Sequence, residues 1–432
     1  MQPAPGRVAS PRLPLSYLVA SAAAFVLAAL AIPWLAPELA GHYYQPRILA
    51  LTHTVTLGWI TLAIMGASYQ IVPIVLGRAI WSERLARWQL ALTAAGVGGM
   101  VGHFFIGQWS GLLWAAGFVT LGVGAHVVNT ALSVRGLTQW TFTARLVVLA
   151  HAGLGLTALY GTLLGLDKIV RVLPGSLFPN LHAHVHLALL GWVLPMVIGV
   201  AARVYPMFLL AREPAGWLGR VQLWGLGLGV PATVAGILAS RTLLAAGALA
   251  VAAAVVAHLA WVIEMVRGRN RPTLDSGLRF VLTGALALVP ATGLGLALAF
   301  EALAGPRVAL AYAALALGAW ASLTIAGMML KIVPFLVWYR AYGPRAGREP
   351  VPMLPELGWP AGERLAWALL TAGFTALAGA LWLGDPAWIR AAGVVVAAGA
   401  VAFAATLLRV LHHLMPCARR VAVTAAPRVG TM

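Results

Sequence analysis

Apolar runs of about 20 residues follow one another along almost the whole chain, and short polar or charged breaks separate them. Because a helix of that length crosses the hydrocarbon core of a bilayer, each run predicts one membrane-spanning helix. The breaks predict twelve spans, at residues 15–37, 48–76, 88–107, 110–134, 144–166, 181–211, 218–239, 243–267, 278–302, 308–339, 362–383 and 387–411. We therefore expect an all-α membrane protein in which residues 1–432 form a single integral membrane domain.

Three of these spans carry copies of one pattern, in which a Trp, a Gly and a Pro stand seven residues apart. The copies are Trp59, Gly66 and Pro73; Trp192, Gly199 and Pro206; and Trp320, Gly327 and Pro334. This spacing predicts three repeats of four helices, at approximately 15–134, 144–267 and 278–411, arranged around a pseudo-threefold axis. Gly allows close helix packing and Trp fills space, so structural roles are favoured for both, and the Pro is expected to end each helix.

The charge distribution indicates topology rather than a charged partner. The chain has a net charge of +18, although only 9% of its residues are charged and 61% are hydrophobic. Arg residues concentrate in alternate loops, and both ends of the chain carry Arg, so the positive-inside bias places these loops and both termini in the cytoplasm. We expect a multi-pass protein of the bacterial cytoplasmic (inner) membrane, in contact with lipid and not with nucleic acid. The Pro-rich stretch at approximately 341–361 is expected to be a cytoplasmic linker. The lone Cys417 excludes an internal disulfide and a multi-Cys metal site.

Histidines gather in one part of the chain. Of eleven His, seven lie in spans two to six: His53, His103, His126, His151, His182, His184 and His186. On a helix His182 and His186 share a face, while His184 points about 160° away from either. His53 and His186 each lie six residues before the patterned Trp, where the third copy has Ala314.

Imidazoles at this depth are typical of axial heme ligands or of ligands to copper or another transition metal. The alternative is that they are hydrogen-bonded packing residues, or that the 182–186 run lies in water at the membrane edge. We expect His53 and His186 to bind a low-spin heme from both sides, and His184 to face a second heme or a metal. The predicted metal ligands are therefore His53, His184 and His186.

Four further histidines are weaker candidates. His182 and His103 are possible additional ligands, since His103 lies near the outer end of its helix at comparable depth. His126 and His151 fall on the cytoplasmic side of adjacent helices and could form an inner site. A packing or proton-path role is the favoured interpretation of that pair.

The run His184-Val-His186-Leu-Ala-Leu-Leu-Gly-Trp192 resembles the His-x-His helix in the catalytic subunit of the heme-copper oxidase superfamily, especially its C-type oxygen reductase and nitric oxide reductase branch. His53, followed by Ala67-Ser-Tyr-Gln-Ile-Val-Pro73, is similar to the helix of that family that supplies the outer low-spin heme ligand. The resemblance extends along essentially the whole chain. It implies one or two b-type hemes, with His184 on the high-spin and His186 on the low-spin heme. It also implies a cytochrome c or quinol electron donor and additional subunits.

The chain departs from the family pattern at two helices. The family carries its His-x-His on helix ten, where this chain has no His from Trp320 to Pro334, and span seven also lacks the histidines of a copper site. A copper or non-heme iron ion in a binuclear centre is therefore disfavoured. Either the ligands have moved between repeats or the catalytic metal has been lost. A weaker resemblance is to the nitric-oxide-response NnrS-type membrane proteins, which are also His-rich.

The function that these observations imply is heme binding in respiratory electron transfer. If the protein is an enzyme, it is an oxidoreductase that reduces nitric oxide or oxygen. Two alternatives are a His-rich transporter or handler of copper or another transition metal, and a non-catalytic heme relay or anchor subunit of a redox complex. Three repeats of the same direction favour the oxidase-like scaffold, and no chain of carboxylates marks a proton pump.

Overall fold

The computed structural model describes residues 9–213 and 216–415, so Arg7, Cys417, Arg419 and Arg420 lie outside the described residues. The all-α prediction is confirmed, and eleven helical segments of the described chain are long and apolar enough to cross a membrane. Eight are single helices: α1 (Arg12–Trp34), α6 (Leu112–Val134), α7 (Phe142–Leu166), α10 (Gly216–Ala239), α11 (Arg241–Arg267), α12 (Ser276–Ala299), α15 (Pro360–Leu383) and α16 (Pro386–His412). Three are composite: α3 (Pro46–His53), η1 (Thr54–Thr61) and α4 (Leu62–Leu76); α8 (Leu177–His186), η2 (Leu187–Val193) and α9 (Leu194–Leu209); and α13 (Pro306–Ala313), η3 (Ala314–Ser322) and α14 (Leu323–Ala341).

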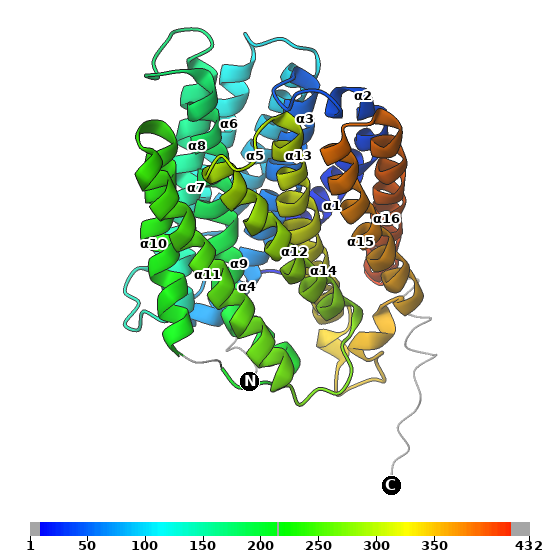
Figure 1. Cartoon of the computed structure of the whole chain (residues 1–432). Coiled ribbons are helices and arrows are strands. Elements are labelled where there is room, and N and C mark those ends of the chain that lie inside the picture. Colours follow the sequence, from blue (N-terminus) through cyan, green and yellow to red (C-terminus); the bar gives the residue numbers. More distant parts are fainter. Residues whose placement is uncertain (1–8, 214–215, 416–432) are drawn as a thin grey trace.

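The predicted span at 88–107 corresponds to α5 (Glu83–Phe105), which is 23 residues long but is not among the eleven. Glu83, Arg84, Arg87 and Gln89 occupy its first two turns and make it more polar than the others. Helices that follow one another in the chain pack side by side, as α5 does on α6, α10 on α11 and α15 on α16. The first helix, α1, packs on the last, α16, so the bundle closes on itself (Figure 1).

Each composite helix contains a π-helical segment, and these three segments hold the patterned tryptophans. Trp59, Trp192 and Trp320 are all buried. Segment η1 begins directly after His53 and η2 directly after His186, while η3 begins at Ala314. π-Helical turns inside α-helices are found frequently at functional sites. The structure thus places both predicted heme ligands at a junction between α- and π-helix.

The patterned glycines lie where each composite helix crosses the first helix of its predicted repeat. An added Cβ would stand too close to that helix in every case, at 2.5 Å for Gly66 (from Tyr17 Cβ on α1), 2.8 Å for Gly199 (from Leu146 Cβ on α7) and 2.5 Å for Gly327 (from Gly277 O on α12). Close helix approach therefore explains the glycine of the pattern.

The prediction that the patterned prolines end their helices is wrong. Helices α4 and α9 run three residues past Pro73 and Pro206, and α14 continues to Ala341. The chain turns at Gly77 (φ 64°) and Leu210 (φ 52°), whose N–H groups donate to the carbonyls of those two prolines. A left-handed residue after the last helical one is a common helix end, because its N–H satisfies a free carbonyl.

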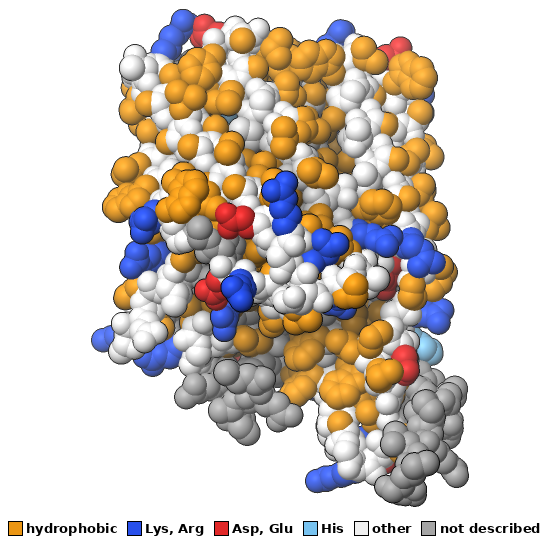
Figure 2. Space-filling view, turned by 60° about the horizontal axis from the view of Figure 1, so that its bottom comes forward, with side chains coloured by type: hydrophobic (Ala, Val, Ile, Leu, Met, Phe, Trp, Pro, Cys, Tyr) orange, Lys and Arg blue, Asp and Glu red, His pale blue; other side chains and the backbone are white. Residues whose placement is uncertain are grey.

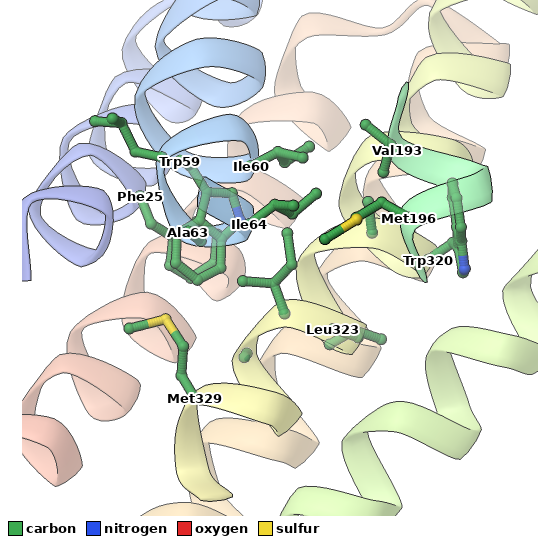
Figure 3. Packing of buried hydrophobic residues seen from close by; sticks show 14 of the residues in the cluster. Phe25, Trp59, Ile60, Ala63, Ile64, Val193, Met196, Trp320, Leu323 and Met329 are labelled. Atoms are coloured by element: carbon green, nitrogen blue, oxygen red, sulfur yellow. The ribbon is translucent and has the colours of Figure 1, made fainter. Parts of the chain in front are cut away.

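A cavity of about 70 Å³ lies between α4, α9 and α14. Its walls come from the same five places in each copy, namely four, five, eight, nine and twelve residues after the Trp: Ala63, Ile64, Ala67, Ser68 and Ile71; Met196, Val197, Val200, Ala201 and Val204; and Thr324, Ile325, Met328, Met329 and Ile332. In Figure 3, Ile64 and Met196 point toward one another across the centre of the bundle. The three composite helices therefore surround one apolar centre and run in the same direction.

Both ends of the described chain lie at one end of the bundle. The Ser10 N–H donates to Glu83 at the start of α5 (2.7 Å), and the Tyr342 hydroxyl after α14 pairs with Nδ1 of His413 after α16 (2.7 Å). We call this the proline end, after Pro73, Pro206 and Pro334, and the opposite one the histidine end, after His53, His184 and His186. Lys and Arg side chains gather round the proline end in Figure 2, and hydrophobic side chains cover the sides of the bundle.

The stretch predicted as a linker, 341–361, packs back on the bundle. It forms two short 3-10 turns, η4 (Gly343–Arg345) and η5 (Leu354–Leu357). The Trp338 indole N–H donates to the carbonyl of Pro352 (2.7 Å), and Leu357 is fully buried. These contacts make the stretch a cover of the proline end rather than a free connection.

Candidate functional site

His53 and His186 are held in the same way. Each is the last residue of an α-helical segment, and its Nδ1 lies beside the carbonyl four residues earlier, at 2.7 Å from Leu49 O and 2.8 Å from His182 O. A carbonyl only accepts hydrogen bonds, so Nδ1 carries the proton and Nε2 of the neutral ring keeps its lone pair. Metal-bound histidines are fixed by this same kind of bond, which sets both the tautomer and the ring direction.

The two rings face different helices. His53 stacks on Phe104 of α5, with ring centres 4.8 Å apart and planes at 29°. His186 stacks on Tyr312 of α13, with ring centres 6.0 Å apart and planes at 17°. Both histidines are half-buried. The two predicted ligands thus lie at the histidine end, but on different sides of the composite helices.

His184 faces α7. Its ring packs edge to face on Tyr160 (6.2 Å, 82°), and a Cβ on Gly161 would stand 2.9 Å from its Cε1. Its Nδ1 is buried and has no hydrogen-bond partner of acceptable geometry, although the Thr157 backbone lies nearby. His184 also lies close enough to His53 for the two imidazoles to interact electrostatically. Side chains from two different spans are thus brought together, and one of them has a buried polar atom without a partner.

His182 lies at the rim of the histidine end. Its Nε2 is 2.9 Å from the Tyr43 hydroxyl, and its ring packs near Phe178. His42 stacks on Tyr43 and Phe178 in the same group. This aromatic group covers the end of α8, and His182 already has a hydrogen-bond partner there.

His103 lies apart from the other outer histidines, between α5 and α6. The Trp114 indole N–H donates to its Nε2 (3.1 Å), and its ring lies directly against Gly111. Nε2 of His103 is therefore the acceptor of the Trp114 hydrogen bond, and Nδ1 of His103 is buried without a partner among the described residues. Of the predicted additional ligands, neither His103 nor His182 presents a free Nε2.

His126 and His151, the predicted inner pair, do come together. Both are buried, their Nε2 atoms are 3.2 Å apart, and their rings stack at 5.0 Å and 26°. Trp192 packs edge to face on both rings. Adjacent spans place the two residues at the same depth, as the sequence suggested.

Several neighbours of these histidines give little signal in the sequence. Phe104, Tyr160 and Tyr312 are aromatic residues in apolar helices, and only their contacts single them out. Gln89 gives a stronger signal, because a buried amide within a hydrophobic segment must find partners. His258 of α11 is also buried, with Nδ1 unpartnered, but lies on a helix to which the pattern assigns no role.

Within residues 9–213 and 216–415, no group of three His, Cys, Asp or Glu side chains is close enough to hold a metal ion. A heme with two axial histidines needs only two protein ligands. No protein-family model matches the chain, and no curated protein matches it. What is established is a multi-pass helical membrane protein with histidines gathered at one end.

Proposed function

We propose that the protein is a heme protein of the bacterial cytoplasmic membrane, in which His53 and His184 hold one b-type heme at the histidine end. The observation that supports this proposal is the state of the two side chains at the histidine end. Nδ1 of His53 is fixed by the Leu49 carbonyl, and His184, which is near enough to His53 for an electrostatic interaction, has a buried nitrogen without a partner among the described residues. Two imidazoles from different helices are a ligand set that heme iron accepts. The donor set therefore fits the group, and the predicted pairing of His53 with His186 stays a prediction beside this one.

His186 would be a separate ligand position. Its Nε2 is free and its ring lies on Tyr312 of α13, on the side of the third composite helix. A second heme held there by His186 alone would keep one axial position open. Reduction of nitric oxide or oxygen would need such an open position, whereas the His53 and His184 heme would serve as a relay.

The architecture supports the remaining parts of the proposal. Equivalent positions of all three composite helices line the central cavity, which favours three four-helix repeats around a pseudo-threefold axis. Lys and Arg side chains surround the proline end (Figure 2), which favours a cytoplasmic location for that end and for both termini. The histidine end would then face outward, where a cytochrome c or the partner subunits of a respiratory complex could exchange electrons with it. A quinol is the alternative donor.

Bound heme would supply one-electron transfer. The chain's own residues orient the ligands and control their surroundings. The Leu49 and His182 carbonyls hold Nδ1 of His53 and His186, so that each Nε2 points away from its own helix. Phe104, Tyr160 and Tyr312 place aromatic surface against the three imidazoles and reduce the access of water.

The decisive experiment is a reduced-minus-oxidised optical spectrum of the purified protein, with pyridine hemochrome and metal analysis on the same sample. We expect a b-type spectrum. His53→Ala and His184→Ala should each lose the low-spin signal, because that signal would need an imidazole from both residues. His258→Ala is the matched control, since it removes a buried histidine from a distant helix and should retain full heme.

The outcomes separate the alternatives. Full heme content in both ligand variants would refute the ligand assignment. Protein that contains no heme but binds copper or another transition metal would favour the metal-handling function. Heme that does not respond to carbon monoxide would identify a relay, and heme that binds carbon monoxide would support gas chemistry at an open position.

A further inference from the structure

A second polar system lies nearer the proline end, buried between α1, α4, α5, α6 and α7. Its members form one chain of contacts, and all of them are buried: Tyr17, Gln89, Tyr69, His126 and His151. The Tyr17 hydroxyl contacts Oε1 of Gln89, and the Tyr69 hydroxyl lies 2.9 Å from the same oxygen and 3.0 Å from Nδ1 of His126. Nε2 of His126 then lies 3.2 Å from Nε2 of His151.

Both ends of this chain are fixed by backbone carbonyls. The Tyr17 hydroxyl lies 2.6 Å from Ala86 O, and Nδ1 of His151 lies 2.7 Å from Val147 O. Because carbonyls only accept, His151 must carry its proton on Nδ1. Nε2 of a neutral His151 can then only accept, so the contact between the two imidazoles needs a proton from the side of His126.

The orientation of the Gln89 amide decides where that proton comes from. With Oε1 toward the tyrosines, Tyr69 donates its only proton to Gln89, and Nδ1 of His126 must donate to Tyr69. A neutral His126 then has a bare Nε2, and two lone pairs face each other at 3.2 Å. One additional proton between the two Nε2 atoms satisfies both imidazoles and gives the pair one positive charge, while the single proton of Tyr17 is shared between Ala86 O and Gln89 Oε1.

With the amide turned over, the contacts from Ala86 to His151 are all satisfied without that charge. The Gln89 NH₂ group then donates to both tyrosine oxygens, Tyr17 donates to Ala86 O, and Tyr69 donates to Nδ1 of His126. Nε2 of His126 donates to His151. Oε1 of Gln89 then accepts from the Thr93 hydroxyl, 3.4 Å from that end of the amide, but it also faces the Met65 sulfur at 3.0 Å, which cannot donate to it. Amide oxygen and nitrogen have nearly the same shape, so this turn requires little repacking.

We propose that His126 and His151 form a binding site for a single proton, and that the Gln89 amide turns over when the proton binds or leaves. The proton comes from water, no bond other than hydrogen bonds changes, and the charge of the pair rises by one. The two states differ in the direction of every hydrogen bond between Gln89 and His151. The site lies apart from the histidine end and does not depend on the proposed heme.

The titratable groups that face the pair are Tyr69 on α4 and, one step further, Tyr17 on α1, while α5 contributes the neutral Gln89. Within the described residues, no carboxylate, Lys or Arg side chain makes a hydrogen bond or ion pair with any member of the chain. The cost of burying a charge there must therefore be offset by the hydrogen bonds to Tyr69 and to the Val147 carbonyl.

A line of hydroxyl groups leads from the pair toward the proline end. Thr130 Oγ1 lies 3.1 Å from Nε2 of His151. Ser133 is one turn further along α6, on the same face, and its hydroxyl accepts the N–H of Trp81 (2.8 Å) in the connection before α5. These two hydroxyl groups lie on the side of the pair that faces the proline end.

The test is solid-state nitrogen NMR of the full-length protein in lipid bilayers, with ¹⁵N in the His rings and Gln side chains, under reducing conditions that keep any low-spin heme diamagnetic. We expect a scalar coupling between the Nε2 atoms of His126 and His151 in both states, because a proton lies between them in each, and the response of the Gln89 amide to pH distinguishes the two states. The coupling should disappear in His151→Gln and persist in His258→Gln. The Gln89 side-chain signal should change at the same pH as the His pair, whereas that of Gln222, another buried amide, should not.

Tyr69→Phe tests the link between the amide and the pair. It removes the acceptor for Nδ1 of the charged His126, and hydrogen bonds to charged groups are the stronger ones. The midpoint of proton binding should therefore fall by about one pH unit, a tenfold loss of proton affinity. Tyr205→Phe, which alters a buried tyrosine beside the central cavity, should leave it unchanged.

Three results would overturn the proposal: no coupling between the two rings at any pH, a Gln89 signal that does not follow the His pair, or equal shifts in the two tyrosine variants. None of these readouts depends on heme. A protein without heme that shows the coupling, and in which the Gln89 signal follows the His pair with pH, would refute the proposed function and leave the proton site standing.

Discussion

Replacing Gly327 by Ala tests the close crossing of the composite helices. The added Cβ would stand 2.5 Å from the carbonyl oxygen of Gly277 and 2.8 Å from Cβ of Phe280. Both atoms are backbone or directly attached to it, so no side-chain rotation relieves the contact and α12 and α14 must separate. Overpacking of this kind costs about 1–3 kcal/mol, occasionally more, and Ala regains up to about 1 kcal/mol of helix propensity. We expect a net loss of about 1–2 kcal/mol in the free energy of unfolding.

Gly98→Ala provides the matched control. Gly98 lies within α5, and nothing stands within 4 Å of a Cβ added there, so only the gain in helix propensity remains. Unfolding in mixed micelles, titrated with a denaturing detergent and followed by tryptophan fluorescence, gives both free energies on one scale. Gly327→Ala should unfold earlier than the wild type, and Gly98→Ala at the same point or later. A Gly327→Ala variant as stable as Gly98→Ala would refute the close-crossing explanation of the pattern.

Three further predictions concern the loops and the ligands. Asp167 accepts the N–H groups of Val172 and Leu173 (2.8 Å each), and these bonds hold the pKa of its carboxyl below the usual range. The pKa of Asp167 is lower in the folded than in the unfolded protein, so the stabilisation is complete above the unfolded-state pKa and is lost as pH falls through the folded-state pKa. Hydrogen exchange of the Val172 and Leu173 amides, corrected for intrinsic rates, should therefore accelerate below about pH 4 in the wild type but not in Asp167→Asn. Leu210→Gly should raise the free energy of unfolding by about 0.5–1 kcal/mol, because Leu210 has a left-handed φ of 52° that glycine adopts freely, and a lower thermal midpoint would contradict this. His186→Ala should leave the low-spin heme spectrum in place and remove any signal that responds to carbon monoxide, whereas loss of the low-spin signal would restore His186 as the partner of His53.

The sequence predicted the helices well because each apolar run has to satisfy its backbone within itself in lipid. The bounds of most spans agree with the structure to within a few residues. The third span is the exception, since α5 contains polar residues such as Gln89 and His103 as well as several glycines and is not among the strongly apolar helices. The prediction that the patterned prolines end their helices was wrong for a different reason. A proline in the last turn of a helix still allows its own carbonyl to accept the N–H of a left-handed residue four positions later.

The sequence predicted candidate ligands, and both these ligands and their pairing stay predictions. The repeated spacing selected His53 and His186, and their common bond to the carbonyl four residues earlier follows from helix geometry alone. Which histidine lies beside which depends on the rotation of α3 and α8 about their own axes. The π-helical segments alter that rotation, and the periodicity of the sequence does not predict where these segments occur.

The sequence by itself therefore determined the class of protein, the number of membrane spans to within one and the direction of the charge bias. These properties depend on composition and on spacing along one helix. The tertiary structure alone decided that Trp114 donates a hydrogen bond to His103, that His126 contacts His151, and that Gln89 connects Tyr17 to this pair of imidazoles on α6 and α7. Each of these facts joins residues from different helices, and such contacts are set by how the helices pack, because side chains far apart in the chain have no local signal that fixes their distance.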